Sequence, residues 1–504
     1  MSVSLNWVAA AACAENFASQ WPANEPGGAI IGFDRQGIRF AYAGGLESLA
    51  TGTAFSADSV VRYASVTKHV FSAMVLQNAG LIALDDRLGD HLAELQPPLA
   101  DVTVGRALDM SGGLPDVREC LTLLGLSVYT ETQKQPLLDF LSSLTRLNFD
   151  AGTDVSYSNT GYRLVEAALE RKGKTFDAFV QDEIAGPLGI FLKAPEVWND
   201  PVSGLVPGYF KDDETWQLSA AGLHISASGS LTGSGNSLAV WLQHLLAGGD
   251  RHAGLLGALS ATRCMGDGRP SNYGLGLRWS ELAGRRFVGH GGSHPGYKSY
   301  FLLDPEAGTG FVVVSNRDDT NGYKIALAAM GALTGLPLPQ TNCTIPDGLY
   351  VTETGPYWIE MAGGIATYLD AEDTLYDDGD GWFSSRSASS PMRLRWTGTA
   401  LEGEAGYINR RFLPVKPGLA SADLDGHWVA AEYGARFDIR DGMVSMGIGP
   451  TRHAMPLVPL GNGRFLFTLI DGPWRKRICL HCLADGKVEL VLSRSRMMEY
   501  TLAR

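Results

Sequence analysis

The chain changes its hydrophobic pattern at about residue 332, and this change most limits the folds open to it. Before that point, apolar residues at helical spacing alternate with short strand-like runs, the pattern of an α+β or mixed α/β unit. A segment rich in Pro and Gly follows, LTGLPLPQTNC at 333–343. Beyond it, alternating runs such as YWIEMAG, RLRWTG and RFLFTLI are separated by Gly and Asp, which predicts an all-β region.

The all-β region contains an internal repeat. IPDGLYVTETGPYWIEMAGG, from Ile345, is similar to DLDGHWVAAEYGARFDIRDG, from Asp423. Each has Asp-Gly-x-aromatic-Val, then a strand pattern, then a Gly turn, and LPVKPGLASADLDG separates them. We therefore expect three units: a mixed α/β unit at 1–332 and two antiparallel β-barrels at 343–416 and 421–504.

Charge and apolar content argue against two classes of partner. The 504 residues carry a formal net charge of -13, which disfavours nucleic acid and an anionic membrane surface. No run approaches the ~18 apolar residues of a membrane span. The start, MSVSLNWVAAAACAENFASQW, has no Lys or Arg before its alanine-rich run. It predicts a first helix and not a signal peptide, so we expect a cytoplasmic protein.

The six cysteines are widely scattered and do not predict a disulfide framework. Cys479 and Cys482, in CLHC, are close in sequence. Their offset of three puts them on opposite faces of a predicted strand, and no second ligand pair stands nearby. We therefore expect structural thiols and no metal site.

One stretch of the first unit contains Ser-x-x-Lys, at Ser65 and Lys68 in VVRYASVTKHVFSAMVLQNAG. Apolar residues recur at helical spacing after the serine, so Ser65 should lie at the first turn of a buried helix, with Lys68 one turn later on the same face. A lysine desolvated among apolar neighbours can be neutral and act as the base that a serine nucleophile needs. By itself, the string also fits an N-cap serine followed by a surface lysine.

Two further short patterns follow in order. Tyr157 and Asn159 form Tyr-x-Asn just before a helical run, and His290 is followed by two glycines at the end of a predicted strand. The same patterns recur at 252–254, 294–296 and 407–409, which we expect in loops or outside the first unit. Without further context, Tyr157 also fits a turn aromatic that caps a helix, and His290 a strand-end histidine with local partners.

Together these motifs resemble the serine β-lactamase and penicillin-binding-protein superfamily, and within it the D-aminopeptidase branch, which has two C-terminal β-barrels. GLIALDDRLGDHL, TVGRALDMSGGLPD, YSNTGYRLVEAALERKGKTFDAFVQDEIAGPLGI and YGLGLRW are similar to the family and occur in its order. The resemblance covers nearly all of residues 1–332. Over the remaining residues it rests on layout.

The resemblance implies a role for each motif residue. Ser65 attacks an acyl carbonyl, Lys68 exchanges its proton, and Tyr157 relays that proton to the leaving amine. Asn159 hydrogen-bonds the substrate.

The strand of His290 contributes backbone groups. The resemblance implies an oxyanion hole formed by the Ser65 N–H and a backbone N–H just past His290, that of Ser293. Gly291 and Gly292 would let the substrate approach this strand closely.

His290 differs from the residue that most of the superfamily has at this position, and the difference limits the class of substrate. Most of the superfamily has lysine where His290 stands, and that cation helps to hold a substrate carboxylate. Because a histidine with a pKa near neutrality is a weaker anion clamp, the departure disfavours C-terminal specificity and suits release of an N-terminal residue.

The leading hypothesis is therefore hydrolysis of N-terminal D-amino acids from short peptides, amides or esters through a serine acyl-enzyme, without a cofactor. The resemblance also implies inhibition by β-lactams and a homodimer. Two alternatives stay open: an esterase or β-lactam-hydrolysing enzyme of the same superfamily, and a catalytically idle ligand-binding regulator.

An N-terminal ammonium needs an anionic or carbonyl partner, and the three motifs supply no carboxylate. In RFLFTLIDGPWRKRICL, Asp471 opens a predicted turn between two strand runs. The resemblance suggests that a loop from the last barrel enters the active site, and this turn stands where that loop is expected. Asp471 would then pair with the ammonium, although an ordinary hairpin turn fits the same residues.

Overall fold

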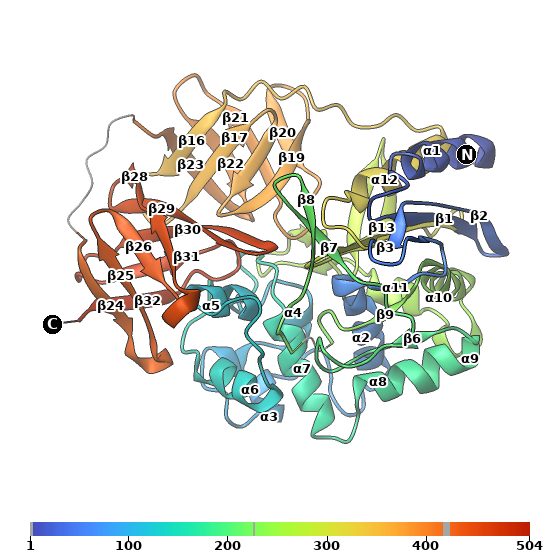
Figure 1. The fold of residues 1–504 in the computed structure, drawn as a ribbon, viewed down its shortest axis with the longest axis horizontal. Coiled ribbons are helices and arrows are strands. Elements are labelled where there is room, and N and C mark those ends of the chain that lie inside the picture. The colour runs from blue at the N-terminus through green and yellow to red at the C-terminus, as the bar shows by residue number, and fades with distance from the viewer. Residues whose placement is uncertain (1–3, 225–226, 417–423, 504) are drawn as a thin grey trace.

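The computed structural model describes residues 4–224, 227–416 and 424–503. A mixed α/β domain is followed by two antiparallel β domains, which confirms the predicted fold class (Figure 1). The predicted boundary at residue 421 and the chain ends at 1 and 504 lie outside the described residues.

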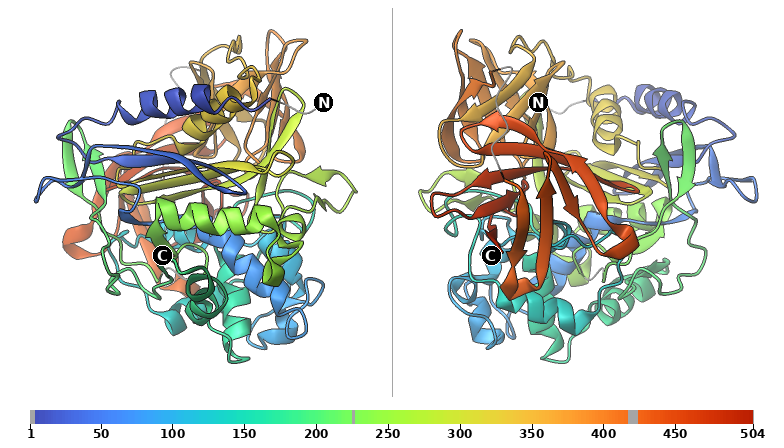
Figure 2. Two further views of the ribbon diagram at one scale, coloured as in Figure 1. Left: turned by 90° about the vertical axis from the view of Figure 1, so that its right-hand side faces the viewer. Right: turned by 60° about the vertical axis from the view of Figure 1, so that its left-hand side comes forward.

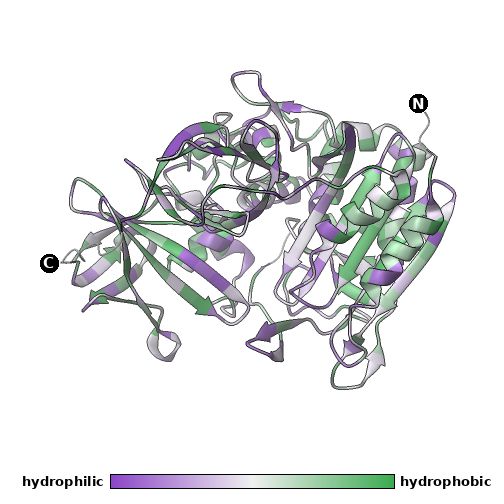
Figure 3. Cartoon of the chain, turned by 90° about the horizontal axis from the view of Figure 1, so that it is seen from above, coloured by the Kyte–Doolittle hydropathy of each residue, from purple (hydrophilic) through white to green (hydrophobic). Residues whose placement is uncertain are grey.

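The first domain is built on a six-stranded antiparallel sheet of order β12-β13-β14-β15-β1-β2. Helices α1 (Trp7–Ala18) and α12 (Gly322–Thr334) pack on one face and α10 (Gly235–Ala247) on the other (Figures 2 and 3). Both faces of the central strands are covered, which explains their nearly continuous apolar sequences. The strands are β1 (Gly28–Asp34), β2 (Gly37–Gly44), β12 (Arg278–Leu282), β13 (Arg285–His294), β14 (Tyr297–Asp304) and β15 (Thr309–Ser315).

A helical region surrounds α2 (Thr67–Gln77), which is buried from Thr67 to Val75. Its other helices are α3 (Leu88–His91), α4 (Val104–Leu108), α5 (Val117–Leu123), α6 (Lys134–Ser143), α7 (Thr160–Glu170), α8 (Phe176–Phe179), α9 (Gly186–Leu188) and α11 (Leu255–Leu259). Short strands connect them: β3 (Leu46–Ser48), β4 (Thr53–Ala54), β5 (Val60–Arg62), β6 (Leu192–Lys193), β7 (Tyr209–Asp212), β8 (Thr215–Leu218), β9 (Thr232–Ser234), β10 (Arg263–Cys264) and β11 (Pro270–Ser271). Within the described ranges, no helix has the length and apolar character needed to cross a membrane.

The second domain is a closed eight-stranded barrel in which β16 pairs with both β17 and β23. Its strands are β16 (Gly348–Thr352), β17 (Trp358–Ala362), β18 (Ile365–Tyr368), β19 (Ala371–Asp377), β20 (Trp382–Ser385), β21 (Met392–Trp396), β22 (Leu401–Ala405) and β23 (Ile408–Pro414).

The third domain is a nine-stranded antiparallel sheet of order β27-β26-β25-β24-β32-β31-β30-β29-β28, curled so that β27 lies beside β29. Gly348 and Gly426, the equivalent glycines of the sequence repeat, have φ angles of 150° and 151°, so both copies begin with the same backbone conformation. The strands are β24 (Gly426–Ala430), β25 (Ala435–Arg440), β26 (Met443–Met446), β27 (His453–Pro456), β28 (Val458–Gly461), β29 (Arg464–Asp471), β30 (Trp474–Cys482), β31 (Val488–Val491) and β32 (Met498–Leu502).

Alternate side chains of β30 pack against the first domain and against the barrel, so this strand holds the third domain to both. Ile478 and Leu480 belong to the core that continues into the first domain, whereas Cys479 points to the core of the barrel. Cys482 packs on the first of these cores, so the two cysteines of CLHC face opposite sides, as their offset of three requires. This packing holds loops of the third domain beside the motif residues of the first.

Candidate active site

The candidate nucleophile lies on a tight turn before α2. Ser65 is the middle residue of a 3-10 turn, Ala64–Val66, and is partly exposed. Ala64 has a φ of 50°, a left-handed conformation that is uncommon for alanine. Thr67 holds the turn, because its Oγ1 donates to Ala64 O at 2.6 Å and accepts from Leu231 N at 2.9 Å.

Lys68 is fully buried directly below this turn. Its Nζ lies 3.2 Å from Ser65 Oγ, 2.8 Å from Asn159 Oδ1 and 2.7 Å from Ser228 O. Burial lowers the pKa of Lys68 well below its usual value, the Asp116 carboxylate opposes this shift, and nearby arginines add to it. A neutral amine has two N–H donors for the two acceptors and a lone pair for the serine proton. The environment therefore suits Lys68 as a general base.

Asp116 orients Asn159 and escaped the sequence-based prediction. Its Oδ2 accepts from the Asn159 N–H at 2.8 Å and from Asn159 Nδ2 at 2.7 Å, and its Oδ1 caps α5. The Asn159 amide is thereby fixed with Oδ1 toward Lys68. In the sequence, Asp116 follows a proline at the start of a predicted helix. That position indicates a helix cap and gives no sign of a role in the active site.

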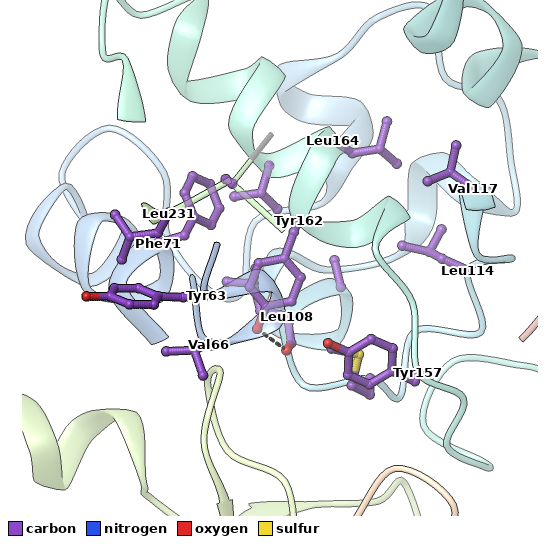
Figure 4. Close-up of a cluster of buried hydrophobic side chains, with 14 of the residues drawn as sticks. Tyr63, Val66, Phe71, Leu108, Leu114, Val117, Tyr157, Tyr162, Leu164 and Leu231 are labelled. Atoms are coloured by element: carbon purple, nitrogen blue, oxygen red, sulfur yellow. Dashed lines mark hydrogen bonds between the residues drawn. The ribbon is translucent and has the colours of Figure 1, made fainter. Parts of the chain in front are cut away.

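Tyr157 lies at the edge of the buried cluster shown in Figure 4. Its hydroxyl is buried and has no hydrogen-bond partner among the described residues, and the Lys68 Nζ lies 4.7 Å from its ring centroid. Burial raises the pKa of Tyr157 to about 12, with the nearby Ser65 side chain acting in the opposite direction. The phenol is therefore protonated at neutral pH and can donate its proton.

The strand of His290 presents its edge to the nucleophile turn. β12 covers β13 only as far as Gly289, and the rest of β13 contacts the turn that carries Ser65. His290 is fully buried, with Nδ1 2.7 Å from Gly291 O and Nε2 2.8 Å from the Tyr273 hydroxyl. Because a carbonyl can only accept, Nδ1 carries the hydrogen and Nε2 accepts from Tyr273.

Burial lowers the pKa of His290 well below its usual value, and the nearby Arg278 guanidinium is the next largest cause. The ring is therefore neutral, and both of its nitrogens have partners. In the structure His290 supports the wall of the site and presents no cation to a ligand.

Gly292 and Ser293 differ in what they contact. A Cβ at Gly292 would lie 2.0 Å from Tyr63 O, so the missing side chain lets β13 approach the backbone just before Ser65. Ser293 is exposed, and its Oγ accepts a hydrogen bond from Lys298 Nζ at 2.7 Å. The Cβ position of Gly292 is thus filled by the protein's own backbone. The close approach of a substrate to Gly291 and Gly292 stays a prediction.

A cavity of about 1010 Å³ opens over Ser65 and is bordered by all three domains. Ser65, Tyr157 and Asn159 line it from the first domain. The barrel and the third domain complete the wall with, among others, Asp373, Arg386, Ser493, Arg494 and Arg496.

The loop between β31 and β32 supplies a residue that no motif indicated. Arg494 O accepts from Asp116 N at 2.8 Å and from Asn148 Nδ2 at 2.9 Å, and Arg494 N donates to Glu119 Oε2 at 2.6 Å. The Arg494 guanidinium lies 4.7 Å from the ring centroid of Tyr157. The third domain therefore does reach the active site, although through a different loop from the one that we expected.

The hairpin of Asp471 also contacts the first domain, at another point. The Asp471 carboxylate accepts from Ser127 Oγ at 3.0 Å and from Val128 N at 2.5 Å. Trp474 donates from Nε1 to Thr122 Oγ1 at 2.9 Å. Asp471 is not among the described residues that line the cavity over Ser65, because its two oxygens hold the loop at 127–128.

Comparisons with known proteins find relatives in sequence and in fold. A D-aminopeptidase of Brucella anthropi is 24% identical over 444 residues, which cover 82% of this chain and 81% of that protein. The octameric penicillin-binding protein homologue of Pyrococcus abyssi has the same fold over 98% of this chain and 100% of its own, with a TM-score of 0.57 and 17% identity.

The D-amino acid amidase of Ochrobactrum anthropi SV3, solved with D-phenylalanine, matches 65% of this chain and 98% of its own, with a TM-score of 0.53 and 19% identity. The family model described as beta-lactamase matches residues 15–335, which include Ser65, Lys68, Tyr157 and His290. Since that match spans more than half of the 504 residues, the chain belongs to the beta-lactamase family.

Proposed function

We propose that the protein hydrolyses small amides and peptides that begin with a D-amino acid, through an acyl-enzyme on Ser65. The observation that carries the proposal is the contact of Ser65 Oγ with a buried Lys68 whose surroundings favour the neutral amine. The similarity to D-aminopeptidases over four fifths of the chain supports the choice of substrate.

The chemistry would proceed in two steps. Ser65 Oγ attacks the acyl carbon as its proton passes to Lys68 Nζ, and the oxyanion is received by the N–H groups of Ser65 and Ser293. The C–N bond then breaks, the Tyr157 hydroxyl gives its proton to the leaving amine, and Lys68 returns a proton to Tyr157. Water attacks the acyl-enzyme through the same groups, releases the acid and restores Ser65.

Asn159 would act on Lys68 in this scheme. Its Oδ1 and the Ser228 carbonyl accept both N–H groups of the neutral amine, so the lone pair is directed at Ser65. This arrangement supports a base that is oriented before the substrate arrives. A direct contact of Asn159 with the substrate, as first predicted, stays a prediction, as do the homodimer and the cytoplasmic location.

The ammonium of the substrate requires an acidic partner in the cavity. The pairing of Asp471 with this ammonium stays a prediction, and among the described residues no contact of Asp471 with the cavity supports it. Asp318 is a better-supported candidate, because it lines the same cavity as Ser65 and its Oδ1 is buried without a partner among the described residues. Asp319 offers a matched control, since its carboxylate is already paired with Arg317 at 2.6 Å.

A panel of chromogenic substrates tests the function. We expect the protein to cleave D-alanyl p-nitroanilide at least tenfold faster than the L-isomer, and Ser65→Ala to abolish turnover. Asp318→Asn should lower kcat/KM about tenfold for D-alanyl p-nitroanilide and spare D-lactyl esters, which lack the amine. Asp319→Asn should leave both unchanged. Turnover of esters and a chromogenic cephalosporin without any cleavage of D-aminoacyl anilides would refute the proposal in favour of the esterase or β-lactamase alternative.

A further inference from the structure

The segment that carries Tyr157 has no regular secondary structure. Residues 154–158 lie between a turn and α7, and all five are buried. Ser156 N donates to Met110 O at 3.0 Å, and Ser158 N donates to Met110 Sδ at 3.2 Å. Because the Tyr157 hydroxyl has no hydrogen-bond partner among the described residues, its position depends on how this segment is held.

Asp154 ties the start of this segment to both β domains. Its Oδ1 accepts at 2.9 Å from the backbone N–H of Tyr407, in the barrel turn between β22 and β23. Its Oδ2 lies 3.5 Å from Nη1 of Arg496, on the β31–β32 loop of the third domain. Only 2% of Asp154 is exposed, so both contacts are shielded from water. One carboxylate therefore joins all three domains three residues before Tyr157.

The barrel turn fits closely against Asp154 because it carries a glycine. Gly406 has a φ of 71°, and a Cβ there would lie 2.1 Å from Asp154 Oδ1. Gly398, in the turn between β21 and β22, has a φ of 92°, and its Cβ would meet no described atom within 4 Å. Both turns use the left-handed conformation that glycine favours. Of the two glycines, Gly406 is the one that also permits contact with the first domain.

Arg269 of the first domain anchors the same barrel turn. Its Nη2 donates to Tyr407 O at 2.9 Å, and its Nη1 pairs with Glu404 Oε1 at 2.9 Å. The Tyr407 hydroxyl donates to Pro270 O at 3.0 Å. The recurrence of Tyr-x-Asn at 407–409 thus serves to dock the barrel on the first domain. The turn is a fixed support against which Asp154 is held.

The third domain holds the same segment from the β31–β32 loop. Ser156 Oγ donates to Ser493 O at 3.2 Å, and Arg496 Nε donates to the same carbonyl at 3.0 Å. Arg494, between these two loop residues, places its guanidinium 4.7 Å from the ring centroid of Tyr157. The backbone just before Tyr157 is therefore fixed by contacts from both β domains.

We propose that Asp154 is a positioning residue for Tyr157, and that the two β domains act through it to set the place of the proton donor. The inference rests on the proposed function and adds a dependence of amine release on domain packing. The donor is in place only while the barrel turn and the β31–β32 loop hold Asp154.

The attack step should depend far less on this carboxylate. Ser65 is activated by Lys68, and Lys68 is oriented by Asn159. Asn159 is held separately, because Asp116 Oδ2 accepts from both its backbone N–H and its side-chain amide. Loss of Asp154 should therefore affect leaving groups that need a proton and nearly spare those that leave as anions.

The test compares D-alanyl p-nitroanilide with D-alanyl p-nitrophenyl ester, which share the acyl group. The aniline nitrogen must be protonated as the C–N bond breaks, whereas p-nitrophenolate leaves as an anion. Asp154→Ala should lower kcat/KM about tenfold to 100-fold for the anilide and less than about threefold for the ester. Gly406→Ala should act in the same direction, and Gly398→Ala, its matched control, should leave the ratio of the two values unchanged.

Two further measurements separate positioning from a purely structural role. In Tyr157→Phe protein, adding Asp154→Ala should cause little further loss on the anilide, because Asp154 acts through the missing hydroxyl. In protein labelled with 3-fluorotyrosine, the fluorine NMR signal that Tyr157→Phe lacks should shift in Asp154→Ala and keep its position in Gly398→Ala. This second readout needs no turnover.

The outcomes distinguish this inference from the proposed function. If the wild-type protein does not cleave the anilide, the proposed function fails, and the fluorine signal alone decides: a shift in Asp154→Ala supports the inference, and an unchanged signal overturns it. Equal losses on anilide and ester in Asp154→Ala, or losses that multiply with Tyr157→Phe, would also overturn it. If Asp154→Ala does not fold, Asp154→Asn and Gly406→Ala undergo the same comparisons.

Discussion

A single methyl group at Gly292 probes how the nucleophile is held. The added Cβ would lie 2.0 Å from Tyr63 O and 2.4 Å from Ser299 Oγ. The Tyr63 carbonyl belongs to the backbone that leads into Ser65, and it accepts a 2.6 Å hydrogen bond from Ser299 Oγ. Because one of the two contacts is backbone, β13 and the nucleophile turn must separate to admit the methyl group.

The size of the effect follows from these contacts. Overpacking of this kind costs about 1–3 kcal/mol, and loss of the Ser299–Tyr63 hydrogen bond adds about 1 kcal/mol. A shift of ~1 Å at Ser65 lowers the rate of reaction about 100-fold. We expect Gly292→Ala to fold with reduced stability and to lose about two orders of magnitude in kcat/KM, mostly in kcat.

The assay combines steady-state kinetics on D-alanyl p-nitroanilide with thermal unfolding. Gly257→Ala on α11 is the matched control, because its Cβ would meet no described atom within 4 Å. Wild-type turnover and unchanged stability in Gly292→Ala would refute the idea that β13 positions Ser65 by direct backbone contact.

Four further results are expected. Lys68→Met should reduce kcat/KM by at least 1,000-fold. The double variant Ser65→Ala/Lys68→Met should have a kcat/KM little below that of either single variant, because nucleophile and base act as one unit. Losses that multiply in the double variant would contradict the role of Lys68 as the base. Catalysis needs neutral Lys68, so kcat/KM should fall as the pH drops through its lowered pKa. Asp116→Asn removes the charge that raises this pKa and should move the acid limb of the pH profile to lower pH, and a move to higher pH would count against it. Tyr157→Phe should cost about 100- to 10,000-fold in kcat by loss of the proton donor, whereas a smaller effect on amides than on esters would exclude the donor role. Asp471→Asn should lower stability by about 1–3 kcal/mol with equal losses on substrates with and without an amine, and a loss confined to amine-bearing substrates would restore it as the ammonium partner.

The motif residues could be predicted because each lies at the start or end of a regular element. Ser65, Lys68 and Tyr157 each lie on a helix or in the turn just before one. Residues a few positions apart in such a segment have predictable relative positions, so their spacing in the sequence predicts which of them lie close together. The change of hydrophobic pattern after residue 332 likewise predicted the all-β region. Apolar and polar residues alternate along a half-buried strand wherever that strand lies in the sheet.

The third domain's contribution could not be predicted, because it depends on how three domains pack. Arg494 stands in the polar loop LSRSRMM, which has no periodicity and no motif. The turn at Asp471 was recognised from its composition and does contact the first domain, but sequence does not show that Ser127 and Val128 occupy its carboxylate. Docking partners of this kind become visible only in the folded chain.

The most direct test of the account is the site of acylation. After brief exposure of the protein to a β-lactam or a slowly hydrolysed D-alanyl ester, peptide mass spectrometry should find the acyl group on the peptide that contains Ser65. Ser65→Ala should carry no adduct under the same conditions. An active preparation in which Ser65 stays unmodified while another residue is acylated would contradict the account.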